Sequence, residues 1–128
     1  MHEMGITQGI IDASVEAAEK AGAVRIVRIE VRVGELTEIV ETALHFAFDA
    51  LAPGTLAEGA VLNVTMVSPR SHCNDCGIDF DHDRFEMLCP ECGSFLVTPL
   101  AGRELQIDSI ETEDAPPDPP AGDDVQRQ

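Results

Sequence analysis

The sequence predicts an α+β protein, in which a small antiparallel three-stranded sheet with two helices carries an inserted zinc ribbon. Three observations support this fold class. Two stretches space their apolar residues as a helix does, three stretches alternate apolar and polar residues as a half-buried strand does, and two CxxC pairs lie between the second and third of those strands. A chain of 128 residues has room for one modest core and a metal-held appendage.

Two segments show helical periodicity. The first runs from about Met4 to Ala21, and Gly22 supplies a C-terminal stop. The second runs from Val40 or Glu41 to Leu51 and ends at the Pro53-Gly54 pair. Each has one apolar stripe, made by Ile6, Ile10, Ile11, Val15 and Ala18 in the first helix and by Leu44, Ala47, Phe48 and Leu51 in the second.

Three segments alternate with the period of two that is typical of a strand with one wet face: residues 27–33, 60–67 and 104–110. Because a lone short strand is unstable in water, we expect the last one to return and pair with the first two. The ribbon is then an excursion from the sheet domain. We therefore assign residues 1–68 and 100–112 to an α+β domain, 69–99 to a zinc ribbon, and 113–128 to a disordered, acidic and proline-rich tail.

All four cysteines lie in the predicted ribbon, as Cys73 and Cys76 followed by Cys89 and Cys92. A glycine follows each pair, which lets backbone amides approach the sulfur atoms, and two such turns can aim four thiolates at one tetrahedral zinc ion. Four thiolates leave no coordination position open for substrate or water. The sequence therefore predicts a structural zinc ion that holds together a ribbon too small to build its own core.

Three other uses of these cysteines stay open from the sequence. They are a redox dithiol, an iron site of rubredoxin type, and two disulfides. A redox dithiol is the usual reading of a lone CxxC beside a βαβ pattern, and this segment has neither feature.

The net charge of −16, with only eight lysines and arginines, argues against nucleic acid as a partner, because phosphate binding needs a basic face. No window approaches the roughly 18 consecutive apolar residues of a membrane span, and the first residues lack the pattern of a signal peptide. We therefore expect a cytoplasmic protein without a membrane partner, whose thiols stay reduced and available to metal.

The amino terminus, Met1-His2-Glu3, is the second stretch with metal chemistry. The Met1 amine, the deprotonated amide nitrogen of His2 and the His2 ring nitrogen can form adjoining chelate rings around one ion. Three nitrogens in a plane suit nickel(II) or copper(II) better than zinc, and Glu3 or another acidic side chain can complete the plane. Such an exposed site would release its metal more readily than the closed cysteine site.

Several motifs together resemble the HypA/HybF family of nickel metallochaperones over about residues 1–112. They are Met1-His2-Glu3-Met4 at the first helix, Gly34-Glu35-Leu36 after a strand, Phe46-Ala47-Phe48 in the second helix, the four-cysteine ribbon, and Ala101-Gly102-Arg103-Glu104-Leu105 before the last strand. The resemblance implies that His2 binds nickel, that Glu3 assists, and that Cys73, Cys76, Cys89 and Cys92 hold zinc. Family members commonly carry an acidic residue early in the second helix, whereas here Val40 lies between Glu38 and Glu41.

The function implied by the resemblance is delivery of transferable Ni(II) during maturation of [NiFe]-hydrogenase. Its partners would be the nickel-handling GTPase HypB and the hydrogenase large-subunit precursor, with urease maturation proteins added by analogy. The sequence contains no phosphate-binding glycine loop, nucleophile elbow or HExxH motif, so we predict a protein that is not an enzyme. The alternative is a zinc-ribbon adaptor that binds proteins and carries no transferable metal, and a zinc enzyme ranks third.

The remaining histidines are assigned ordinary positions. We expect His45 to be a partly buried or surface residue of the second helix, and His72 and His82 to lie on the ribbon surface.

Overall fold

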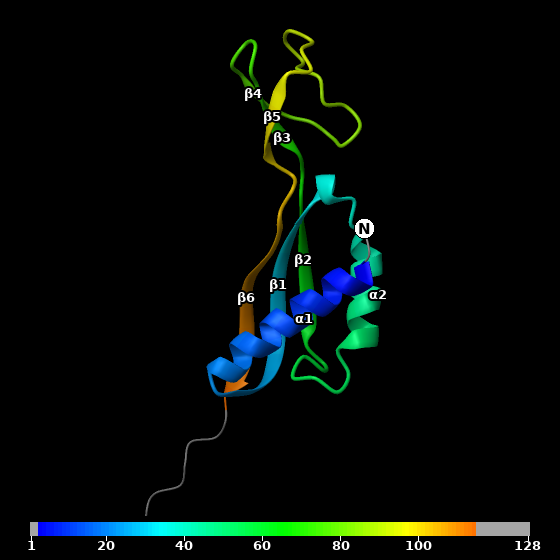
Figure 1. Ribbon diagram of the computed structural model, residues 1–128, viewed down its shortest axis with the longest axis vertical. Helices are drawn as coiled ribbons and strands as arrows, with labels where there is room; N and C mark the ends of the chain where they lie inside the picture. The colour runs from blue at the N-terminus through cyan, green and yellow to red at the C-terminus, as the bar shows by residue number, and fades with distance from the viewer. Residues whose placement is uncertain (1–2, 115–128) are drawn as a thin grey trace, which may run out of the picture.

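A computed structural model of the chain describes residues 3–114 (Figure 1). Met1 and His2, two of the three predicted nickel ligands, lie outside the described residues, as does the predicted tail from residue 115 to 128. None of the helices within the described part is long and apolar enough to cross a lipid bilayer.

Both predicted helices are present. Helix α1 spans Glu3–Lys20 and helix α2 spans Glu41–Leu51, with a short 3-10 helix, η1 (Glu35–Thr37), before α2. Gly22 has a φ of 76°, a left-handed conformation that favours glycine and turns the chain from α1 into the first strand.

The main sheet has three strands in the order β2-β1-β6, so the last strand returns to the first two as predicted. The strands are β1 (Ala23–Gly34), β2 (Val61–Val67) and β6 (Leu105–Asp114). Strands β1 and β6 are antiparallel, but β1 and β2 are parallel, so the expectation of antiparallel pairing throughout was wrong for that pair. The reason is that α2 carries the chain back along the sheet before β2 begins, which is a βαβ crossover (Figure 1).

The antiparallel pair of β1 and β6 is longer than the alternation of apolar and polar residues predicted. Strand β6 continues to Asp114, which pairs with Ala23 at the start of β1, and Glu113 pairs with Arg25. The guanidinium of Arg25 lies 3.3 Å from the Glu113 carboxylate. Residues 113 and 114, which we had assigned to the tail, are therefore the end of a strand. The pairing of β1 with β6 shifts register between Ile26 and Arg28, and this shift points the Ile26 side chain toward the core.

The core lies between the two helices and one face of this sheet, with α1 crossing in front of the strands (Figure 1). Its buried residues follow the predicted stripes closely. They include Ile10, Ile11 and Ala18 of α1, Ile26, Ile29, Val31 and Val33 of β1, Leu44 and Phe48 of α2, and Leu62 of β2. Ile6, Val15 and Leu51 pack against this cluster while only partly buried.

A second, smaller sheet forms the ribbon at one end of the molecule (Figure 1). Its strands are β3 (Arg70–Cys73), β4 (Asp79–Asp81) and β5 (Val97–Ala101), paired antiparallel in the order β4-β3-β5. Its core is small, and consists of Cys73, Phe80 and Cys89 with Ile78 and Val97 packed against them. So few apolar contacts support the interpretation that metal binding stabilises this part of the fold.

Candidate metal centre

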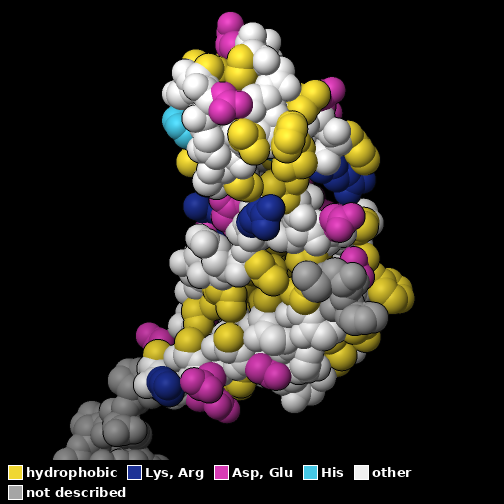
Figure 2. All heavy atoms as spheres, turned by 45° about the horizontal axis from the view of Figure 1, so that its top comes forward, with side chains coloured by type: hydrophobic (Ala, Val, Ile, Leu, Met, Phe, Trp, Pro, Cys, Tyr) yellow, Lys and Arg dark blue, Asp and Glu magenta, His cyan; other side chains and the backbone are white. Residues whose placement is uncertain are grey.

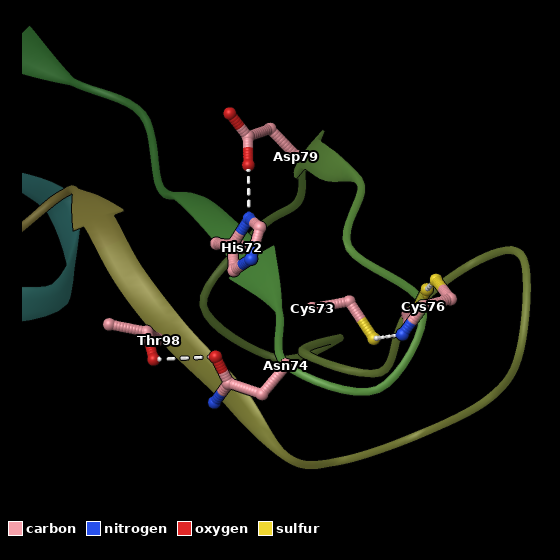
Figure 3. A network of polar contacts seen from close by, with 7 residues as sticks. His72, Cys73, Asn74, Cys76, Asp79 and Thr98 are labelled. Carbon is pink, nitrogen blue, oxygen red and sulfur yellow. Dashed lines mark hydrogen bonds and ion pairs between the residues drawn. The ribbon is translucent and has the colours of Figure 1, made fainter.

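The first CxxC pair lies in a tight turn after β3. The amide of Cys73 donates to the carbonyl oxygen of Ile78 at 2.8 Å, and the amide of Gly77 donates back to the Cys73 carbonyl at 2.9 Å. Gly77 has a φ of 84°, so the glycine predicted at this position is required by the backbone conformation. The Cys76 amide also lies 3.4 Å from the Cys73 sulfur atom, as expected for a turn that supports a thiolate (Figure 3).

The second pair repeats this geometry at Cys89. The Cys89 amide donates to the Ser94 carbonyl oxygen, and the Gly93 amide donates to the Cys89 carbonyl oxygen, each at 2.9 Å. Gly93 has a φ of 75°. Two equivalent turns that face one another can present four sulfur atoms to a single ion.

The sulfur atoms of the four cysteines lie within 4.8 Å of one another. Cys73 Sγ is 3.6 Å from Cys92 Sγ, and Cys76 Sγ is 3.5 Å from Cys89 Sγ. A metal–sulfur distance of about 2.3 Å in a regular tetrahedron requires sulfur atoms about 3.8 Å apart, so the arrangement fits a four-thiolate metal site. All four cysteines are free thiols here, and the alternative of two disulfides does not describe this structure.

Backbone amides and neighbouring sulfur atoms shift the pKa values of three thiols in this cluster. A hydrogen bond from the Cys76 amide is the main reason why the pKa of Cys73 falls to about 6. The Ile78 amide lowers the pKa of Cys76, but partial desolvation and the neighbouring sulfur atoms outweigh it and raise that pKa to about 12. The pKa of Cys92 is also raised, since the Cys73 sulfur and desolvation outweigh the amide of Ser94. The turn at Cys73 thus favours a thiolate at that residue, and a bound cation would compensate the negative charge of further thiolates in the cluster.

The two ribbon histidines have their own partners. His72 Nδ1 lies 2.6 Å from an Asp79 carboxylate oxygen, on the other side of β3 from the sulfur of Cys73 (Figure 3). His82 Nε2 lies 2.7 Å from the Ser71 hydroxyl. Both rings are half-buried, and these contacts hold them as parts of the ribbon surface.

One contact of the site was missed at the level of sequence. The Ser94 hydroxyl donates a short hydrogen bond to the Asp75 carboxylate and so links the two cysteine turns. Asp75 lies inside the first CxxC and Ser94 follows the second, so their proximity depends on the two turns facing each other. The Asn74 amide group accepts from Thr98 in β5 at 3.1 Å and fastens the first turn to the sheet (Figure 3).

Of the predicted nickel ligands, the structure describes only Glu3, which is the first residue of α1 and is half-buried. Glu3 and Met4 border a hollow of about 280 Å³ with Ala43, Phe46 and Ala47 of α2. Within residues 3–114, the four cysteines form the one cluster of three or more metal-ligating side chains with donor atoms this close. The nickel ligand set therefore stays a prediction.

The two glutamates around Val40 lie in other surroundings. A Glu41 carboxylate oxygen lies 3.5 Å from Nε2 of His45 on the same helix. Glu38 has a φ of 62° and borders a hollow with Arg84 and Phe85 of the ribbon. No described contact joins either carboxylate to Glu3.

A helix-covered sheet joined to a four-thiolate ribbon defines a two-module metal-binding protein. The sequence family described as "Hydrogenase/urease nickel incorporation, metallochaperone, hypA" matches residues 1–112. The chain belongs to this family, and the resemblance drawn from its motifs is confirmed.

Similar proteins support the same assignment. The hydrogenase maturation factor HypA of Chlorobium luteolum is 44% identical over 110 residues, which are 86% of this chain and 94% of the relative. That of Caldanaerobacter subterraneus is 40% identical over 114 residues, which are 88% of this chain and 100% of the relative. The solution structure of the Ni metallochaperone HypA from Helicobacter pylori matches with a TM-score of 0.66 at 26% identity, and covers 90% of this chain and 100% of that one.

Proposed function

We propose that this protein is a nickel metallochaperone that binds Ni(II) at its amino terminus and delivers it during maturation of [NiFe]-hydrogenase. The observation that carries this proposal is the family match, which begins at residue 1 and so includes Met1, His2 and Glu3. Nickel is cargo in this scheme. The Met1 amine and the two His2 nitrogens provide a planar donor set that suits Ni(II), with Glu3 as a further ligand.

The two modules have different metals and different tasks. Residues 1–68 and 100–112 carry the nickel site, and residues 69–99 carry zinc on Cys73, Cys76, Cys89 and Cys92. The sulfur geometry supports zinc in this role, because four thiolates close the coordination sphere and hold the two turns together. Zinc therefore stabilises the ribbon and takes no part in nickel exchange.

Transfer proceeds by ligand exchange at the amino terminus, where a donor of the acceptor replaces one protein ligand at a time. The chain itself is no enzyme, and the energy for transfer comes from the GTPase HypB. The acceptor is the hydrogenase large-subunit precursor, and urease maturation proteins are further partners by analogy with the family description. All of these events take place in the cytoplasm.

The alternative function is a zinc-ribbon adaptor without transferable metal. Exposed apolar side chains on the ribbon favour it, since Phe85 and Phe95 are 82% and 76% exposed. Where exposed apolar side chains form a contiguous patch, they mark a protein contact site.

Calorimetric nickel titration separates the two functions. The untagged wild-type protein with a free Met1 amine is compared with His2→Ala, and His45→Ala serves as the histidine control on α2. We expect nickel binding to be lost in His2→Ala and retained in His45→Ala, with zinc content unchanged in both. If His2→Ala binds nickel with unchanged stoichiometry and affinity, the carrier function at this site is wrong and the adaptor function is favoured.

A further inference from the structure

Arg103 differs from the other cations of this acidic chain. Residues 3–114 contain seven lysines and arginines. Five of them lie within 4.0 Å of a carboxylate, namely Lys20, Arg25, Arg28, Arg32 and Arg70. Arg84 lies over the ring of Phe85, 4.9 Å from its centroid. Arg103 is exposed and forms no ion pair with a described residue, although acidic residues outnumber basic ones by 24 to 8.

Arg103 lines the first of two hollows that follow one another along the chain where β5 leads into β6. It lines a hollow of about 250 Å³ with Pro99, Leu100 and Ala101 at the end of β5 and with Glu104, whose carboxylate accepts from the Gly102 amide at 2.7 Å. The chain then enters β6, where Leu105 and Ile107 form one wall of a second hollow of about 360 Å³. Leu100 and Leu105 are 51% and 42% exposed. We call these two hollows together the neck face.

Helix α1 forms the other wall of the second hollow through Gly5, Ile6, Gly9 and Ile10. A Cβ atom built on Gly5 or Gly9 would have no other atom within 4 Å, so space next to both glycines is open. Glycine at these two positions therefore leaves room for a side chain of a partner beside α1. Figure 2 shows apolar side chains gathered where the ribbon meets the helix-covered module, with cationic side chains among them.

We propose that the neck face is the docking surface for an apolar segment of the nickel-accepting protein, and that a carboxylate of that segment pairs with Arg103. The apolar hollows fit side chains such as leucine or valine, and the unpaired guanidinium offers a fork of donors to one carboxylate. This inference rests on the proposed function, because the acceptor is the partner named there.

The location of the neck face suits transfer. Gly5 and Ile6 follow Glu3 within one turn of α1, so a segment bound there lies next to the helix end that carries the proposed nickel ligands. Docking would hold the acceptor close to the nickel and so replace a bimolecular exchange by a local one.

Two other occupants are weaker. A second copy would bring together two chains that each carry a net charge of −16, and long-range repulsion opposes this contact. The acidic residues after Asp114 begin at the far end of β6 from Leu105 and would have to return along the whole strand. The binding experiment described next distinguishes both of these occupants from a segment of the acceptor.

Binding of the purified hydrogenase large-subunit precursor to the zinc-loaded, nickel-free full chain tests the proposal. We expect Arg103→Glu and Gly9→Leu each to weaken binding by about tenfold or more, since one removes the ion pair and the other fills the hollow. Arg25→Glu and Ala17→Leu are the matched controls, on the open face of the sheet and further along α1, and we expect changes below about twofold. Circular dichroism and zinc content verify that each variant is folded.

A crosslink identifies the partner carboxylate. Arg103→Lys places an amine at the same position, and carbodiimide coupling followed by mass spectrometry should join it to an aspartate or glutamate within an apolar segment of the precursor. Absence of that crosslink in a complex that still forms would overturn the assignment of Arg103.

Other outcomes also overturn the proposal. The first is unchanged binding of the precursor by Arg103→Glu and Gly9→Leu, and the second is that these variants lose binding to HypB but keep binding to the precursor. Concentration-dependent dimers that these variants abolish would identify a second copy as the occupant. Altered NMR signals of Leu105 and Ile107 in the free chain after removal of residues 115–128 would identify those residues as the occupant. The nickel titration of His2→Ala tests the proposed function on its own, because docking is measured here without nickel. The two failures can therefore be distinguished.

Discussion

Gly34 and Gly102 pack backbone against backbone at the junction of the two modules. A Cβ atom at Gly34 would collide with the Gly102 carbonyl group. The Leu36 amide donates to the Gly102 carbonyl oxygen, and the Gly34 amide donates to the Glu104 carbonyl oxygen, each at 2.7 Å. Gly102 itself has a φ of 112°. The end of β1 and the start of β6 are thus joined at the point where the ribbon begins.

This contact predicts a large effect of a small substitution. Gly34→Ala should lower the free energy of unfolding by roughly 1–3 kcal/mol, because its methyl group forces backbone atoms apart in a closely packed site. Chemical denaturation of the zinc-loaded protein measures the change.

Gly9→Ala is the control, since the same methyl group meets open space there. Gly9 lies inside α1, and alanine in a helix interior is favoured over glycine by roughly 0.5–1 kcal/mol. We expect this variant to be more stable than the wild type. Equal effects of the two substitutions would contradict the packing described at the junction.

These glycines also show where sequence prediction stopped. Gly34-Glu35-Leu36 and Ala101-Gly102-Arg103 were both singled out as motifs, but periodicity describes one segment at a time and gives no contact between distant segments. The parallel β1–β2 pair was missed for a related reason. Alternation within a strand is set by its own two faces, whereas the pairing direction is set by the crossover through α2.

The four cysteines predict a second test. Cys73→Ser removes a buried thiol of the proposed zinc site, and we expect loss of bound zinc and of the dispersed NMR signals of β3, β4 and β5, while the signals of the helix-covered sheet persist. Metal analysis by mass spectrometry measures zinc. Glu91→Ala, next to Cys92, changes an exposed side chain inside the second CxxC and should retain zinc. A ribbon that stays folded without zinc would refute the structural role.

The ribbon site was predictable in outline because its information is local. A CxxC followed by glycine specifies a turn, and Gly77 and Gly93 have the left-handed φ values that such turns require. The contacts between the two turns, such as Ser94 with Asp75, depend on how the ribbon closes. They are a property of the three-dimensional arrangement and leave no spacing pattern in the sequence.

The carboxylate of Asp83 makes the stability of its turn depend on pH. Its carboxylate accepts from the backbone amides of Glu86 at 2.7 Å and Phe85 at 2.8 Å, and these bonds lower its pKa. Because the folded pKa lies below the ordinary value of about 3.9, the turn gains full stabilisation above that pH and loses it as pH falls through the folded pKa.

A variant tests this turn at neutral pH, where the carboxylate is charged. Asp83→Asn keeps the shape but removes the charge, so hydrogen exchange of the Phe85 and Glu86 amides should accelerate. Asp49→Asn on α2 serves as the remote control. An unchanged exchange rate in Asp83→Asn would mean that the charge contributes nothing to this turn.

Val40 offers the last test, because it is the N-cap of α2 and supplies no side-chain hydrogen bond to the helix. It is 53% exposed, so a polar side chain fits. Val40→Asp and Val40→Asn both provide an acceptor for the free amides of the first turn, and each should raise the free energy of unfolding by about 1 kcal/mol. Helix-dipole stabilisation favours aspartate, while the neighbouring Glu41 opposes it. Thermal unfolding of both variants measures the cap.

The same pair of variants separates capping from metal binding. Only Val40→Asp adds a second carboxylate beside Glu41 at the start of this helix, so we expect tighter nickel binding in that variant than in Val40→Asn. Equal nickel affinity in the two would leave Val40 as a capping position alone. Because the variants share the cap and differ only in charge, the difference between their nickel titrations reports on the carboxylate itself.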